Sequence, residues 1–293
     1  MPSGERHLDT SRFETYPRSQ FLPDTDIELV HPDTVRGRIQ HCLFDFDGTL
    51  SLIRAGWQDV MIPMMVQVLA DIGTGETEEE LAALVTEFVT RLTGKQTIYQ
   101  MIELAQQVSL RGAAPLDPLE YKRQYLDLLW ERIGDRVRGL EAGELHPEAY
   151  LVPGSRRLLD RLAAAGVTMY LASGTDLPYV QNEARVLGLT PYFGDHIYGA
   201  LDDYKSFSKK MVIERIIQQH GLHGPEFCAW GDGYVEIEDA KAVGGVAVGV
   251  ATDETGGRQL NEWKRNRLIQ AGADLIIPDF READAVLDYL GVP

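Results

Sequence analysis

Continuous apolar runs, each about as long as one strand, recur along the chain from residue 41 onward. Strands of a parallel sheet show this pattern because helices cover both faces of the sheet, whereas strands with one exposed face alternate. Segments of helical period separate most of the runs. The pattern predicts an α/β fold with a doubly wound parallel sheet, whose strands are residues 41–46, 167–172, 226–230, 246–250 and 274–277.

The stretch between the first two runs is too long for one crossover helix, and most of it has helical period. Capping boxes and an N-cap predict helix starts at Thr77 with Glu80, at Thr97 with Gln100, and at Asp117 before Pro118. Glycines predict helix ends at Gly73, Gly94, Gly112 and Gly134. We therefore expect an inserted all-helical domain over residues 52–150 and an α/β core over residues 41–51 and 151–293, with a helix over 155–165 leading back to the sheet.

Residues 1–40 are polar and weakly periodic, and we interpret them as an N-terminal extension that contacts the body near residues 27–30. The first twenty residues lack the apolar segment of a secretory signal. No run in the chain approaches the roughly 18 apolar residues of a membrane span. We expect a cytoplasmic protein, either a monomer or a homodimer.

Charge narrows the expected partners. The chain has 28 basic and 45 acidic residues, a net charge of −17, which disfavours binding to nucleic acid or to an anionic membrane. The densest basic segment, residues 263–267, is interpreted as the solvated face of a helix. Cys42 and Cys228 both lie in predicted central strands, so we expect buried free thiols.

Two aspartates follow the first predicted strand, in the segment Asp45-Phe46-Asp47-Gly48-Thr49. Their spacing of two directs both side chains to the same side of the chain, and ligands of open parallel sheets bind at this edge. Asp47 before a glycine is also typical of a simple turn. Asp45 is harder to explain in that way, because a carboxylate at the end of a buried strand needs a cation or several donors.

Polar residues follow two further strands. Ser173 and Gly174 precede a predicted helix, where a hydroxyl and free N–H groups would bind an anion, although an ordinary N-cap has the same residues. Asp232 ends another strand, and Glu236 lies one helical turn later, where it could equally be a first-turn acid that interacts with the helix dipole. Carboxylates that converge on one edge repel one another unless a cation joins them, and oxygen-only ligands favour Mg²⁺.

A bound phosphate also needs positive charge from the protein. Lys209 falls on the same helical face as Ile213, Ile216 and Ile217, so we expect it to point toward the sheet. Lys205, which precedes this helix, is the second candidate, and Lys210 is expected to face solvent.

Together these segments resemble the haloacid dehalogenase-like superfamily, in particular its Mg²⁺-dependent phosphatases with an α-helical cap. The resemblance runs from about residue 40 onward and implies a Rossmann-like core with residues 52–150 as the cap. The segment 45–49 matches the first family motif, Ser173 with Gly174 the second, Lys209 the third and Gly231-Asp232 the fourth. Many members have a further aspartate where this chain has Glu236, so the role of Glu236 is left open, with Asp239 a more distant candidate.

The resemblance implies a small phosphomonoester as substrate, such as a sugar phosphate or a phosphoglycolate-like acid. Asp45 would be the nucleophile that forms an aspartyl-phosphate, and Asp47 the general acid and base. Asp45, the backbone carbonyl of Asp47, and Asp232 would hold Mg²⁺, and Glu236 is a candidate for a position outside its direct ligands. Ser173, Gly174 and Lys209 would bind the phosphoryl oxygens.

Residues of the cap would select the substrate. Arg54 and Trp57 follow the first motif closely enough to overhang the site, together with Gly56 and Gln58, and packing inside the cap explains Trp57 equally well. Tyr99 and Gln100 have weaker claims.

Other functions share parts of this pattern. A phosphomutase would use the same residues, and a non-catalytic binding protein could retain the fold. Asp47 disfavours a dehalogenase, which needs no proton donor, and a receiver domain, which has no large helical insertion. A phosphonate hydrolase needs a cap lysine of lowered pKa, but Lys95 and Lys122, the obvious cap lysines, have no apolar surroundings in the sequence.

Overall fold

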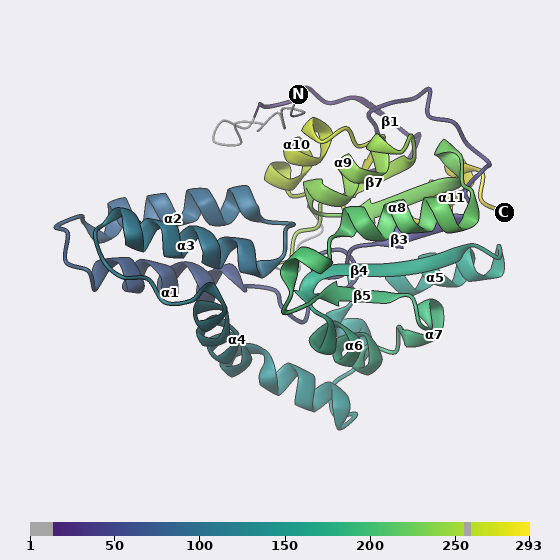
Figure 1. The fold of residues 1–293 in the computed structure, drawn as a ribbon. Helices are drawn as coiled ribbons and strands as arrows, with labels where there is room; N and C mark the ends of the chain where they lie inside the picture. The colour runs from purple at the N-terminus through teal and green to yellow at the C-terminus, as the bar shows by residue number, and fades with distance from the viewer. Residues whose placement is uncertain (1–13, 255–258) are drawn as a thin grey trace.

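The computed structural model describes residues 14–254 and 259–293. In this part of the chain one sheet of eight strands has the order β1-β2-β8-β7-β6-β3-β4-β5 (Figure 1). Its central strands correspond to the apolar runs, namely β3 (His41–Phe44), β4 (Thr168–Asp176), β6 (Phe227–Gly231), β7 (Val246–Val250) and β8 (Leu275–Ile277). β3 lies between β4 and β6 and is parallel to both. The predicted α/β class is confirmed.

Helices cover both faces of the sheet. Phe44 packs on one side with α5 (Ser155–Ala164), α6 (Leu177–Val186), α7 (Thr190–Phe193) and α11 (Ala283–Leu290). Leu43 points to the other side, toward α8 (Lys209–His220), α9 (Tyr234–Ala242) and α10 (Glu262–Gln270). Because neighbouring strand residues face opposite layers and both layers are apolar, the strands read as continuous apolar runs.

Three strands lie outside the predicted set. β5 (Ile197–Ala200) extends the sheet beyond β4, while β1 (Gln20–Phe21) and β2 (Glu28–Leu29) join its other edge. β2 is antiparallel to β8, so the described part of the N-terminal extension enlarges the sheet. Two-residue strands are too short to show a period in the sequence, because alternation needs at least four residues.

Cys42 and Cys228 occupy opposite positions of β3 and β6. Both thiols are buried and free, as predicted. Burial raises the pKa of the Cys228 thiol well above its ordinary value. The thiol therefore stays protonated, which is typical of an unreactive core cysteine.

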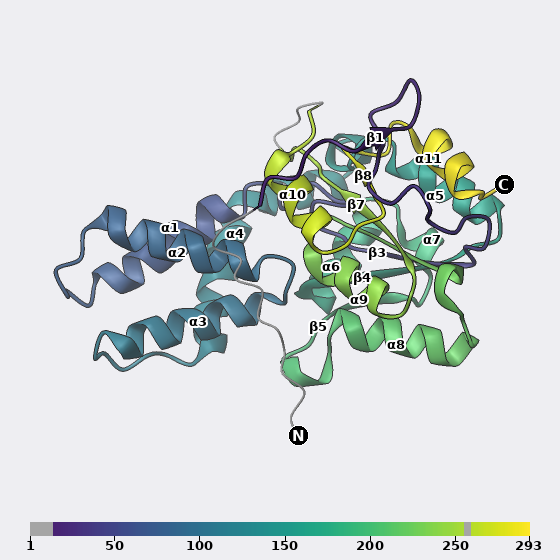
Figure 2. The ribbon, with the colours of Figure 1, turned by 90° about the horizontal axis from the view of Figure 1, so that it is seen from above.

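Four helices lie between β3 and α5 in the chain and project from one side of the sheet (Figures 1 and 2). They are α1 (Gln58–Ala70), α2 (Glu78–Leu92), α3 (Thr97–Leu110) and α4 (Pro118–Glu141). We call this group the cap. Two short 3₁₀ helices, Pro147–Tyr150 and Gly224–Glu226, precede α5 and β6, and a third, Tyr204–Ser206, precedes α8.

Local sequence signals marked most cap helix ends. Thr77 and Glu80 form the predicted capping box, and the Asp117 side chain accepts from the Leu119 N–H. Two predictions were wrong. Thr97 is the first residue of α3 rather than its cap, because the chain enters that helix at Gln96 without a side-chain cap. Gly134 lies inside α4, where a Cβ atom would be 2.9 Å from the Arg138 guanidinium and 3.1 Å from the Trp130 ring, so it leaves room for these side chains of the same helix instead of ending the helix.

The prediction of a solvated face for residues 263–267 was also wrong. Lys264, Arg265 and Arg267 on α10 are 7%, 1% and 4% exposed. Arg265 forms an ion pair of 2.6 Å with the fully buried Glu28 of β2. A residue 237 positions away in the sequence cannot be recognised as a partner from local pattern, because only the sheet brings β2 and α10 together.

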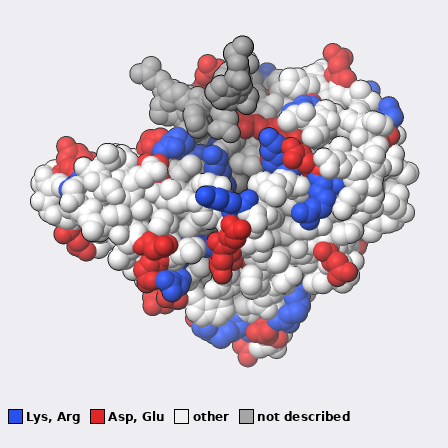
Figure 3. Space-filling view, viewed as in Figure 1, with Lys and Arg blue, Asp and Glu red and all other residues white. Residues whose placement is uncertain are grey.

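Charges of both signs are scattered over the face shown in Figure 3, with uncharged residues between them. Among the described helices, none combines the length and apolar character needed to cross a membrane.

Histidines cluster at the end of the sheet where β3 begins. The His41 ring is 4.4 Å from the His220 ring, and both rings have a nitrogen within 3.2 Å of the Tyr170 hydroxyl. Burial lowers the pKa of His41 below its ordinary value of 6.5, and the neighbouring His220 and His196 lower it further. Protonated His41 is therefore disfavoured in the folded state.

The His41 cluster predicts acid-sensitive stability. The unfolded chain binds this proton more readily, so the free energy of unfolding should decrease as the pH falls below 6.5 and through the lowered pKa. Urea unfolding at a series of pH values should show a smaller decrease for His41→Gln. The variant His31→Gln, at an exposed position, is the control and should follow the wild type. Equal decreases in wild type and His41→Gln would contradict this prediction.

Candidate active site

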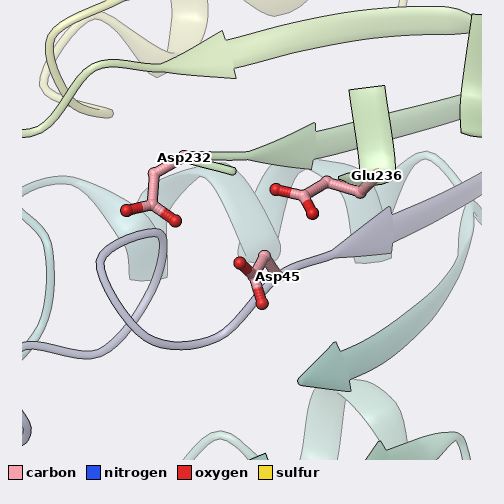
Figure 4. A group of neighbouring side chains, drawn as sticks. All are labelled: Asp45, Asp232 and Glu236. Atoms are coloured by element: carbon pink, nitrogen blue, oxygen red, sulfur yellow. The ribbon is translucent and has the colours of Figure 1, made fainter. Parts of the chain in front are cut away.

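Three carboxylates meet where β3 and β6 end. Asp45 follows β3, Asp232 follows β6, and Glu236 lies in the first turn of α9. One oxygen from each lies within 4.8 Å of the others, and Figure 4 shows the three side chains around a common gap. β3 and β6 are parallel neighbours, with Phe44 opposite Trp230, so the residues that follow them emerge at the same edge.

Lys209 balances part of this negative charge. It is the first residue of α8 and is 5% exposed. Its ammonium is 2.8 Å from an Asp45 oxygen and 2.9 Å from a Glu236 oxygen. Lys205 and Lys210 are both exposed, so the structure brings Lys209, and neither of these two, next to Asp45.

The carboxylates remain in electrostatic conflict. Burial raises the pKa of Asp45 well above its ordinary value, against the opposing effect of Lys209, and the charges of Glu236 and Asp232 raise it further. Burial by itself would lower the pKa of Lys209, but Asp45 and Glu236 raise it above its ordinary value, so the ammonium stays charged. Three close carboxylates with oxygen donors fit a hard divalent cation, which would relieve this repulsion.

Glu236 is the most constrained member of this group. It is fully buried, and its two oxygens accept from the Lys209 ammonium and from the Gly233 N–H at 2.9 Å each. A Cβ atom at Gly231 would lie 1.9 Å from a Glu236 oxygen, so glycine is required there. Asp239, the more distant candidate, is not one of the three grouped carboxylates, and burial raises its pKa to about 6.

The Asp47 side chain is not part of the group of three carboxylates and contacts β4 instead. One of its oxygens accepts from the Thr175 hydroxyl at 2.9 Å and from the Ser173 hydroxyl at 3.3 Å. Its other oxygen is buried, makes no hydrogen bond within the described residues, and is 3.8 Å from the Arg54 guanidinium. Burial raises the pKa of Asp47 to about 6, although Arg54 opposes this. Asp47 can therefore exchange a proton near neutral pH.

Ser173 and Gly174 lie on a longer strand than predicted. β4 continues to Asp176, so they precede α6 by several residues and no helix N-terminus forms at Ser173. Gly174 is nonetheless close to the cap, because a Cβ atom there would be 2.7 Å from the Lys95 carbonyl oxygen. No local pattern in the sequence indicates this contact, because it joins residues about 80 positions apart.

Arg54 already has a carboxylate partner. Its guanidinium forms hydrogen bonds of 2.6 and 3.1 Å with Glu183 of α6, and both side chains are buried. The guanidinium of Arg54 is therefore already paired within the protein, and its expected role in substrate selection remains a proposal.

One cavity of about 630 Å³ lies between the cap and the sheet edge. Its lining includes Asp45, Asp47, Ser173, Gly174, Lys209 and Asp232, but neither Glu236 nor Glu183. Its cap side includes the expected Arg54, Gly56, Trp57, Gln58 and Gln100. Tyr99 is not among the lining residues and packs edge-on against Tyr204. Lys95 also lines the cavity and is exposed, whereas Lys122 is buried in an ion pair with Asp176.

The sequence analysis missed a further cation in the cavity, Lys264 of α10. Its ammonium is 2.7 Å from Asp232 and 2.7 Å from Glu254. Glu254 lies four residues after the end of β7. A carboxylate shortly after a further parallel strand was therefore the sequence signal that could have placed Glu254 at this edge of the sheet. Lys264 was not recognised because its segment had been interpreted as solvated.

The sequence from residue 39 to residue 244 matches the family model of haloacid dehalogenase-like hydrolases. No curated protein matches the chain. The likeness to the family thus spans the first predicted strand, the cap and the strand that precedes Asp232.

Solved structures share the fold at low sequence identity. A family hydrolase from Deinococcus radiodurans R1, with bound phosphate and sodium, is 22% identical with a TM-score of 0.52 and covers 87% of this chain and 98% of its own. A predicted phosphoglycolate phosphatase from Haemophilus somnus 129pt is 17% identical with a TM-score of 0.53, covering 85% and 98%. A β-phosphoglucomutase from Clostridium difficile is 13% identical with a TM-score of 0.55, covering 86% and 97%.

The buried pair between Arg54 and Glu183 predicts a large loss of stability when one partner is removed. We expect Glu183→Gln to lower the free energy of unfolding by about 3 kcal/mol, because a buried guanidinium loses its main partner. The double variant Arg54→Met with Glu183→Met should recover most of this loss in urea unfolding. As a control, Glu141→Gln breaks an exposed pair with Arg185 of α6 and should cost under about 1 kcal/mol. Equal losses in the two single variants would contradict the prediction.

Proposed function

Because the chain belongs to the haloacid dehalogenase-like hydrolases, we propose that it hydrolyses a small phosphomonoester through an aspartyl-phosphate on Asp45. The observation that carries the proposal is the convergence of Asp45, Lys209 and Asp232 in the cavity that Ser173 and Gly174 also line. A buried carboxylate beside a lysine is suited to attack phosphorus when its charge is balanced locally.

In the first step an Asp45 oxygen forms a bond to phosphorus while the bond from phosphorus to the ester oxygen breaks. Asp47 donates its proton to the leaving alkoxide, so an alcohol departs. In the second step water attacks phosphorus, Asp47 accepts a proton from that water, and the bond to Asp45 breaks, which releases phosphate. A pKa of about 6 supports both roles of Asp47 because the group can be populated in either form near neutral pH.

The other residues bind and orient the phosphoryl group. The hydroxyl of Ser173, the N–H of Gly174 and the ammonium of Lys209 would stabilise its oxygens, where charge spreads in the transition state. Asp45, Asp232 and the Asp47 carbonyl would hold Mg²⁺, which when bound supplies positive charge beside those oxygens. Glu236 would orient Lys209 and stay outside the direct ligands, because both its oxygens are engaged.

The charge of the cavity favours a sugar or polyol phosphate over a phosphoglycolate-like acid. Four described Lys and Arg residues line it; three of them, Arg54, Lys209 and Lys264, are buried and paired with protein carboxylates, and the fourth, Lys95, is exposed. A substrate carboxylate would have to compete with these acids, whereas hydroxyl groups need only hydrogen-bond partners. The cap side offers such partners on α2 and just after it, namely Thr86, Thr90, Thr93 and Thr97.

The central test is hydrolysis of p-nitrophenyl phosphate. We expect activity to require Mg²⁺ and to fall by at least about 10³-fold in Asp45→Asn, because the nucleophile is lost. The control Asp127→Asn changes an exposed aspartate on α4 in the same way and should keep full activity. Hydrolysis that survives in Asp45→Asn, or that proceeds equally with a chelator present, would refute the proposed mechanism.

A panel of phosphorylated metabolites tests the substrate class. We expect kcat/KM for hexose and polyol phosphates to exceed that for phosphoglycolate and phosphoglycerate by about tenfold or more, since each acid adds an unpaired charge. Release of inorganic phosphate is the measurement. A preference for the acids would contradict the charge argument, and isomerisation of a hexose phosphate without phosphate release would identify a mutase instead.

A further inference from the structure

Arg267 of α10 makes an unusual contact with the cap. Its guanidinium donates to the carbonyl oxygens of Thr90 at 2.8 Å, Arg91 at 3.1 Å and Thr93 at 2.9 Å. These carbonyls belong to the C-terminal end of α2, where the last carbonyls of a helix lack partners within the helix. A core side chain therefore caps a helix of the inserted region.

The surroundings of Arg267 are specialised for this contact. The side chain is 4% exposed, and its guanidinium lies over the rings of Tyr234 and Trp263, at 4.5 and 5.1 Å from their centroids. Among the described residues it has no carboxylate within ion-pair distance, unlike Lys264 and Arg265 of the same helix. The negative end of the α2 dipole and the ring faces compensate its charge instead. Such compensation depends on α2 staying in place.

The segment that this contact holds covers the site. We call residues 93–97 the roof segment, and Thr93, Gly94, Lys95 and Thr97 of it line the cavity. A Cβ atom at Gly233 would lie 3.2 Å from the Gly94 Cα, and one at Gly174 would lie 2.7 Å from the Lys95 oxygen. The roof segment therefore contacts the loop after Asp232 and also Gly174, one of the residues expected to bind the phosphoryl group.

A second tether holds the other end of the roof segment. The Gln96 side chain donates to the carbonyl oxygens of Phe207 at 2.7 Å and Tyr204 at 3.2 Å, just before α8. Arg267 thus fixes the α2 end of the roof segment, and Gln96 fixes the end at α3. Both contacts are made to backbone carbonyls, so they constrain the path of the chain rather than one side chain.

We propose that Arg267 is a positioning residue that clamps the end of α2 to the core and so holds the roof segment against the part of the substrate that leaves. The contact between Arg267 and α2 does not depend on the proposed function, but its expected effect on kinetics does. Substrates whose leaving group reaches the cap side need the roof segment in place, whereas acetyl phosphate, whose leaving group is small, does not.

The test compares Arg267→Gln with Arg267→Lys, which keeps the charge but loses the planar fork of donors. Arg91→Gln is the matched control, because Arg91 lies at the same end of α2 and pairs with Glu87 and Glu103 of the cap. Hydrogen exchange should become about tenfold faster or more in a peptide over residues 90–97 of Arg267→Gln, with a smaller change in Arg267→Lys. The exchange rate of a peptide over residues 58–70 should not change in either variant. In Arg91→Gln, the exchange rates of both peptides should match those of wild type.

The kinetic readout separates positioning from general destabilisation. In Arg267→Gln, KM for a hexose phosphate should rise about tenfold with a smaller change in kcat, while kcat/KM for acetyl phosphate stays within about threefold of wild type. Unchanged exchange over residues 90–97 in both Arg267 variants, or equal losses on the two substrates, would overturn the proposal. If wild type hydrolyses neither substrate, the proposed function is wrong, and the exchange result alone then supports or overturns the clamp.

Discussion

Burial of carboxylates at the edge of β3 and β6 is the constraint on which the site depends. Asp45 and Glu236 are nearly or fully removed from water, and Asp232 faces them across the gap. Like charges at this distance are tolerated only when cations lie among them. Lys209 contacts Asp45 and Glu236, and Lys264 contacts Asp232, so each lysine satisfies acids from different elements and thereby fixes α8 and α10 against the sheet.

The same principle joins the cap to the core. Arg54, just after the first motif, binds Glu183 of α6, while Lys122 of α4 pairs with Asp176 at the end of β4. Arg267 contacts carbonyl oxygens at the end of α2 instead of a carboxylate. Arg54 and the α2 end that Arg267 contacts, Thr90 and Thr93, line the cavity, so residues that shape the cavity also hold the two parts of the molecule together. Buried charges of this kind specify a geometry because each tolerates few alternative positions.

Much of the architecture could be predicted because its signals are local. Apolar runs marked the central strands, and Thr77 and Asp117 marked cap helices through contacts within three residues. Parallel strands leave their C-terminal residues at one edge, which is why the motif residues Asp45 and Asp232 lie together. The wrong predictions concern residue types that occur in two structural roles. Gly134 packs inside a helix instead of ending it, and Lys264 is buried instead of solvated.

By itself, the sequence determined the α/β class, the helical insertion and the candidate residues at the strand ends, because hydrophobic period and motif order depend on neighbours along the chain. Only the tertiary structure decided which charges meet. Glu28 and Arg265, Arg54 and Glu183, and Arg267 with the end of α2 are all more than a hundred residues apart. Ion pairs and side-chain caps depend on distances in space, and those distances exist only after the sheet and the cap have packed.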